Sequence, residues 1–180
     1  KPKANIMRAQ WAQMSGYNYD DHGRLQNWNA QTNLNLNLQR NAYLYVGTGI
    51  TREKIYEEEF GLKRSPTRPF GTFAGEPFRA TWQQWASTNL NQTPNKRFNY
   101  GIFLGFIRNA FDYFGSVYVP TAGQNLQDPG PGMQLDAQFY AEVKPVDPLR
   151  ASISYTKRRL TRNDNAVRVL DSDLVTFRST

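Results

Sequence analysis

The chain has 180 residues, no cysteine, and 22 Lys and Arg against 15 Asp and Glu. This length suits one ordinary domain, and the missing cysteines exclude disulfides, thiolate metal sites and cysteine nucleophiles. Its 10 Tyr, 11 Phe and 4 Trp argue against a disordered chain, and no run approaches the roughly 18 apolar residues of a membrane-spanning helix.

The clearest predicted strand covers Asn27 to Gln39, where apolar and amide side chains alternate without a break. Successive side chains of a strand point to opposite faces, so this segment has one apolar wall and one wall of amides. The amide wall contains Asn29, Gln31, Asn33, Asn35 and Asn37, and the apolar wall contains Leu34, Leu36 and Leu38. Asparagine is disfavoured in strands, so a special environment is expected for this wall.

Two further strands follow the same pattern with more irregularity. Ala42 to Gly47 alternates aliphatic side chains with tyrosines, and Phe98 to Ile107 has Tyr100 on one face and Gly101 and Gly105 on the other. Glycine inside a strand leaves room for a close approach by neighbouring groups. Both segments are therefore predicted to be strands of the same sheet.

Strict alternation returns at Gln134 to Lys144 and again at Leu149 to Thr156, with Pro145 to Pro148 between them. A connection this short joins antiparallel strands. The predicted polar wall contains Asp136, Gln138, Tyr140, Glu142 and Arg150, and the predicted apolar wall contains Leu135, Phe139, Val143, Ile153 and Tyr155. Val175 and Phe177 belong to a last predicted strand.

The connections alternate between short turns and long polar loops, for example the turn-forming segment Asn91 to Lys96 and the long stretches Arg64 to Gly75 and Thr121 to Gly132. About eight strands of about ten residues in this layout are typical of an outer-membrane barrel. We therefore expect residues 1 to 180 to form a single all-β domain: an antiparallel transmembrane β-barrel, or a segment of a larger one.

The chemistry of the polar wall favours a barrel interior over a water-facing sheet. Solvent faces of soluble strands usually carry Lys, Glu and Thr, whereas Asn27 to Gln39 presents amides and no charge. Amides can bond to one another across a confined lumen. Aromatic side chains expected near strand ends would form the girdles of a membrane barrel. These are Trp28, Phe98, Tyr100, Tyr155 and Phe177.

The segment Met133 to Thr180 carries a resemblance to known proteins, chiefly in LRASISYTKRRL, which begins at Leu149, and in VLDSDLVTFR, which begins at Val169. These residues resemble the late strands of a family of outer-membrane β-barrels of unknown function. In that family the barrel follows an N-terminal carbohydrate-binding-like module. The resemblance implies an outer-membrane location, a link to carbohydrates and further strands after Thr180, so that this chain would be a fragment.

No combination of residues predicts an enzyme, a metal site or a cofactor. His22 is the only histidine, and beside Asp20 and Asp21 it reads as a polar turn. Glu57 to Glu59 lack the spacing of a calcium loop. Asp171 and Asp173 share a strand face but have no opposing carboxylate placed by spacing, so they are expected to be pore-lining charges. Hydrolase activity that uses this pair as acid and base is kept as a third alternative.

The expected function is passage, anchoring or assembly at the outer membrane. The expected partners are the lipid bilayer, other outer-membrane or periplasmic proteins, and a saccharide ligand. Nucleic acid is not expected, because the basic residues are dispersed. The alternative is a soluble β-sheet module that binds polysaccharide or single-stranded nucleic acid by stacking on Trp82, Trp85 and Tyr100 beside Lys96 and Arg97.

Overall fold

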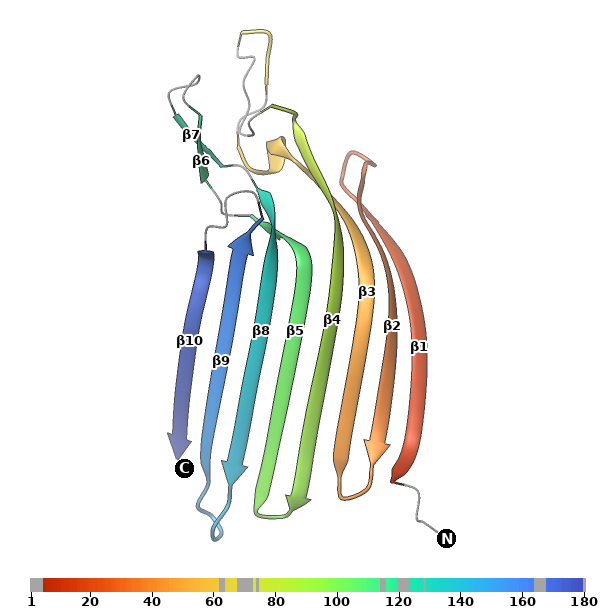
Figure 1. Ribbon diagram of the computed structural model, residues 1–180, viewed down its shortest axis with the longest axis vertical. Helices are drawn as coiled ribbons and strands as arrows, with labels where there is room; N and C mark the ends of the chain where they lie inside the picture. Colours follow the sequence, from red (N-terminus) through yellow and green to blue (C-terminus); the bar gives the residue numbers. More distant parts are fainter. Residues whose placement is uncertain are drawn as a thin grey trace.

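The computed structural model describes residues 5–61, 64–67, 73, 75–113, 116–119, 124–127, 129–163 and 168–179. Its main feature is one sheet of eight antiparallel strands in the order β1-β2-β3-β4-β5-β8-β9-β10 (Figure 1). The strands are β1 (Ile6–Tyr19), β2 (Leu25–Leu38), β3 (Ala42–Tyr56), β4 (Phe78–Asn95), β5 (Phe98–Asp112), β8 (Gly130–Val143), β9 (Ala151–Arg162) and β10 (Arg168–Ser179). The predicted all-β class is confirmed.

Smaller elements lie in the connections. A 3-10 helix, η1 (Glu57–Glu59), follows β3, and the hairpin β6 (Ser116–Val119) and β7 (Gln124–Gln127) lies between β5 and β8. Within the described residues every strand of the main sheet pairs with its neighbour in the chain, apart from this inserted hairpin. The sheet is therefore an antiparallel meander.

The connections differ between the two ends of the sheet (Figure 1). At one end, the short-turn end, residues 39–41, 96–97 and 144–150 join β2 to β3, β4 to β5 and β8 to β9. At the opposite end, the long-loop end, are the two longest connections, 57–77 and 113–129. Parts of the predicted loops 64–75 and 121–132 fall outside the described residues. The expected alternation of short and long connections is confirmed.

The turn between β2 and β3 illustrates how local sequence fixes register. Arg40 and Asn41 have φ angles of 61° and 53°, the left-handed pair that a tight hairpin turn requires. Asparagine tolerates this conformation better than most residues. With this turn, Leu38 lies opposite Ala42 and Asn35 lies opposite Tyr45.

The strand β4 continues further than the sequence indicated. Asn91 to Asn95, predicted to be part of a turn, belong to β4, and the turn contains only Lys96 and Arg97. Asn91 lies between Tyr43 and Gly101 in the register, and its side-chain amide donates to Asn89 Oδ1 at 2.7 Å. The asparagines are thus held by the sheet, and they do not break it.

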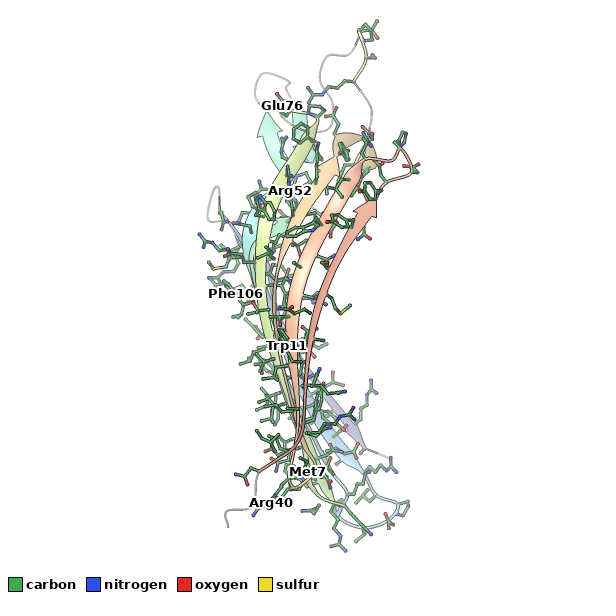
Figure 2. The ribbon with its side chains drawn as sticks, turned by 90° about the vertical axis from the view of Figure 1, so that its right-hand side faces the viewer. Met7, Trp11, Arg40, Arg52, Glu76 and Phe106 are labelled. Carbon is green, nitrogen blue, oxygen red and sulfur yellow. The ribbon has the colours of Figure 1, made fainter. Side chains whose placement is uncertain are left out.

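Most of the sheet has a single layer. Ile55, Phe73 and Phe111 form a small buried cluster, with Phe60 packed against it, at the long-loop end. Figure 2 shows the sheet from the side of β1, strongly twisted, with side chains projecting from its two faces. In the described part of the chain β1 and β10 are the edges of an open sheet.

Candidate functional site

One face of the sheet, the amide face, carries the predicted polar wall across its strands. Register-paired side chains of neighbouring strands point to the same side, and one row runs from Asn35 to Tyr45, Asn89, Phe103 and Gln138. Nine predicted polar-wall residues share this face: Asn29, Gln31, Asn33, Asn35, Asn37, Asp136, Gln138, Tyr140 and Glu142. The tenth, Arg150, lies in the 144–150 turn at the short-turn end.

Side chains of the amide face bond to one another across strands. Tyr43 donates its hydroxyl to Asn35 Oδ1 at 2.6 Å, and Tyr45 donates to Asn33 Oδ1 at 3.0 Å. These bonds satisfy the side-chain oxygens of Asn33 and Asn35 from within the sheet, which helps to explain how the strand tolerates asparagine.

On β8 and β9 the same face carries charged side chains in place of amides, and these charges are paired with one another. Asp136 accepts from Arg158 Nε at 2.6 Å and from Gln134 Nε2 at 2.6 Å. Near the short-turn end, Glu142 accepts from Tyr140 at 3.0 Å and lies 3.1 Å from Lys144 Nζ. Both carboxylates of this region therefore have hydrogen-bond and ion-pair partners within the sheet.

Glycines of the amide face leave space for large neighbouring side chains. A Cβ on Gly47 would lie 2.3 Å from the Tyr45 hydroxyl, and a Cβ on Gly49 would lie 2.8 Å from both the Trp85 ring and the Ala30 carbonyl oxygen. Tyr45 and Trp85 thus extend over the backbone of β3. The face is consequently a closely fitted layer of amides and aromatic rings.

The amide face is covered at its long-loop end. Asn18, Asn27 and Glu53 from the strands and Phe60 and Tyr113 from the connections line a cavity of about 390 Å³. Glu53 accepts from Tyr113 and, at 2.5 Å, from Gln83. Burial and this bond to Glu53 raise the pKa of Tyr113 above its usual value.

The segment that provides this cover is fixed by buried charge pairs. Glu57 is buried and lies 2.7 Å from Arg64 Nε. It also accepts from the Phe73 backbone at 3.4 Å. Asp112 and Arg162 form a second buried pair, 3.5 Å apart. The sequence did not predict either ion pair. Asp112 and Arg162 are 50 residues apart, and Glu57 meets Arg64 only through the path of the connection between them.

The opposite face, the apolar face, carries the predicted apolar wall. A row of register-paired side chains crosses seven strands through Leu36, Leu44, Leu90, Ile102, Phe139, Tyr155 and Val175. All eight predicted residues share this face: Leu34, Leu36, Leu38, Leu135, Phe139, Val143, Ile153 and Tyr155. Trp11, Leu104 and Phe177 are 67%, 48% and 73% exposed, so no described residue covers this face.

Aromatic rings border the apolar face at the long-loop end. Tyr17, Trp28, Arg52 and Trp82 form one row across β1 to β4. The Trp28 and Trp82 rings meet edge to face at 5.6 Å, and the Arg52 guanidinium lies 5.8 Å from the Trp82 ring centroid. Phe98 and Tyr100, with ring centroids 5.6 Å apart, lie at the start of β5, at the short-turn end. Tyr155, predicted near a strand end, instead lies in the middle of β9.

Two groups of predicted residues are distributed differently from expectation. Asp171 and Asp173 are not on the polar wall: they lie on the apolar face, where each is 2.7 Å from Lys157 Nζ. Their pairing with β9 sets this side, which spacing along β10 alone does not reveal. Trp82 and Tyr100 also lie on the apolar face, whereas Trp85 lies on the amide face, so the three rings form no single stacking platform.

The acidic groups of the turn at Asp20 to His22 have protein partners. Ligand atoms of Asp20, Asp21 and His22 lie within 4.8 Å of one another, but Asp20 accepts from Arg24 Nε at 2.6 Å and Asp21 lies 2.8 Å from the His22 ring. Burial acts to raise the pKa of Asp20, yet hydrogen bonds and ion pairing with Arg24 outweigh it and lower the pKa.

The three glutamates of η1 bond in different directions. Glu57 pairs with Arg64, Glu58 lies 2.5 Å from Arg24 Nη2, and Glu59 accepts from Gln26 at 2.8 Å. The three carboxylates therefore hold different parts of the long-loop end.

Comparison with known proteins gives no match to a family model, a curated protein or a solved structure. Among the described residues no helix has the length and apolar character needed to cross a membrane.

Proposed function

We propose that this chain is a β-barrel, or part of a larger one, in the outer membrane, with its apolar face against lipid and its amide face lining the interior. The observation that carries the proposal is that the apolar face has no covering layer among the described residues, whereas the amide face is covered at one end. The apolar row crosses seven strands without a covering layer, whereas the amide face bonds to itself and is covered at one end. Membrane barrels have this inverted arrangement.

The height of the apolar face supports the same proposal. On β2 it extends from Trp28 to Leu38, which is about 33 Å along a strand at about 3.3 Å per residue. A strand tilt of about 40° reduces this to about 25 Å, the height of the apolar band on a membrane barrel. Trp28 and Trp82, at the upper border, suit the interface, where amphipathic rings have one apolar and one wet side.

The interior proposed here serves passage, anchoring or assembly, without catalysis. The amides of β2 and the aromatic rings of Tyr45 and Trp85 would offer hydrogen bonds and flat apolar surfaces together, which suits a saccharide. The edges β1 and β10 would pair with further strands, because an open edge is not stable in lipid. The proposed partners are thus the bilayer, a saccharide, and other outer-membrane or periplasmic proteins.

The resemblance of Met133 to Thr180 to late barrel strands supports the same assignment. On this proposal the chain corresponds to the barrel region of proteins whose N-terminal module resembles carbohydrate-binding domains. The short-turn end would face the periplasm and the long-loop end the outside, as in bacterial barrels generally.

The test is the fractionation of the chain expressed with its natural flanks. We expect it to sediment with outer membranes, to resist high salt and carbonate, and to dissolve in detergent. A folded monomer that stays soluble without detergent would overturn the proposal and favour a polysaccharide-binding module. Carbonate separates a protein held by lipid contact from one held only by surface charge.

A further inference from the structure

Three arginines on the apolar face have no ion-pair partner among the described residues. Arg52, Arg108 and Arg159 are each exposed. Among the described residues, the ion pairs of this face all involve Lys157 on β9 or Arg168 on β10. An exposed cation on a predominantly apolar surface needs an anionic partner or water.

The three arginines lie on a straight oblique line. Ile50 is in register with Gln84 and Gln84 with Arg108, so Arg108 is two residues nearer the short-turn end than Arg52. Phe106 is in register with Leu135 and Leu135 with Arg159, which moves Arg159 two residues further. Each step crosses two strands and two residues. The Cα atoms of neighbouring arginines are therefore about 12 Å apart, and the line makes an angle of about 35° with the direction perpendicular to the strands.

This slope matches the tilt of strands in membrane barrels, which is about 35–45° from the membrane normal. A line at that slope across the sheet would run parallel to the membrane surface. The arginines therefore occupy one depth, at the border of the apolar face on the side of the long-loop end. That depth is where lipid headgroups lie.

Arg159 is a positive charge that the nearby acidic side chains do not balance. Its cross-strand partner is Asp171, but the Asp171 oxygens lie 2.7 Å from Lys157 and 2.8 Å from Arg168. Asp173 also lies 2.7 Å from Lys157. Two acids thus balance Lys157 and Arg168, and the charge of Arg159 is left over.

A groove beside Arg159 supplies the apolar half of a binding site. It has a volume of about 370 Å³ and is lined by Phe106, Met133, Leu135, Arg159, Thr161 and Asn163. Arg108 is in register with Met133, at the far side of the groove from Arg159. An apolar floor between two cations suits a molecule with an anionic head and a hydrocarbon tail.

We propose that Arg108 and Arg159 bind the phosphate of a lipid headgroup, with an acyl chain of that lipid in the groove over Phe106, Met133 and Leu135. Guanidinium groups bind phosphate oxygens through paired N–H donors, whereas a lysine offers only a point charge. This inference rests on the proposed membrane function. Arg52 would contact a neighbouring headgroup at the same depth.

The test uses the full chain in dodecylmaltoside micelles doped with phosphatidic acid or phosphatidylcholine, and native mass spectrometry to count retained lipid. We expect phosphatidic acid to be retained at least tenfold better than phosphatidylcholine. The Arg108→Gln/Arg159→Gln variant should lose this preference, and millimolar inorganic phosphate should not compete. The matched control is Arg40→Gln/Arg97→Gln, which removes two exposed arginines from the short-turn end and should retain the preference.

The outcomes separate this inference from the proposed function. A chain that inserts into liposomes, shows the circular dichroism of a β-protein, and retains both lipids equally would overturn the lipid site alone. Equal losses in the double variant and the control would also overturn it, because the effect would be general charge. Failure of the unsubstituted chain to insert would overturn the proposed function together with the site. The Arg108→Lys/Arg159→Lys variant, which keeps the charge, should retain partial preference.

Discussion

The two faces of the sheet are built on the same strands and satisfy their side chains in opposite ways. On the amide face, Tyr43 and Tyr45 donate to the asparagines of β2, and Asp136 receives Arg158. On the apolar face, Leu104 and Phe177 have no covering layer among the described residues. Burial therefore does not identify the inside of this protein. The proposed orientation, with the amide face inside, depends instead on the chemistry of the side chains that each face carries.

The largest expected effect concerns the buried pair at the long-loop end. Asp112 and Arg162 are 1% and 6% exposed. Asp112→Ala leaves a buried guanidinium without its carboxylate, so we expect a loss of about 3–5 kcal/mol in the free energy of unfolding. Urea titration of the detergent-folded protein measures it. The control is Asp173→Ala, in an exposed pair of the apolar face, which should cost far less, because water screens that pair. Equal costs would show that the Asp112–Arg162 pair is not buried.

The next effect compares neighbouring residues of β2 that point to opposite faces. On the proposed orientation Leu36→Arg places a charge in lipid, and we expect it to disfavour insertion by about 2–4 kcal/mol at mid-membrane. Asn35→Arg should be tolerated, because it changes only the interior. Folding into liposomes, followed by the shift in gel mobility on heating, measures both. Equal tolerance of the two substitutions would refute the orientation.

A smaller effect tests the close fit of the amide face. Gly49→Ala would place its Cβ 2.8 Å from the Ala30 carbonyl oxygen and the Trp85 ring, and we expect a loss of about 1–3 kcal/mol in unfolding free energy. At Gly16 a Cβ would meet only Asn29, at 3.6 Å. Gly16→Ala is therefore the matched control, and urea titration should show it to be close to neutral. If both glycines tolerate alanine, Trp85 does not lie against β3.

The smallest effect lies in the β1–β2 connection, away from both faces. The pKa of Asp20 is lowered in the folded chain by Arg24. Such a group stabilises the fold above its unfolded pKa, and this contribution is lost as the pH falls through the folded value. Asp20→Asn should therefore reduce the stability difference between pH 6 and pH 3, measured by thermal unfolding. An unchanged difference would show that Arg24 does not hold this carboxylate.

The alternation of side chains determined much of this protein from sequence alone. In β2, β8 and β9 a period of two residues assigns each side chain to a face without knowledge of partners, because the geometry of a strand is local. The predicted sets around Asn35 and Leu36 accordingly fall on opposite faces of the observed sheet. The alternation of short turns and long loops could also be predicted from the sequence, because the residues that favour a turn act locally.

Only the tertiary structure decided how the faces of different strands combine. Spacing within β10 puts Asp171 and Asp173 on one side, but their pairing with β9 decides that this side is the apolar face. Pairing likewise separates Trp82 from Trp85, and it aligns Arg52, Arg108 and Arg159, which are distant in the chain. The physical reason is that register depends on hydrogen bonds between strands. The periodicity of one strand does not show which side chains of the neighbouring strand share its face.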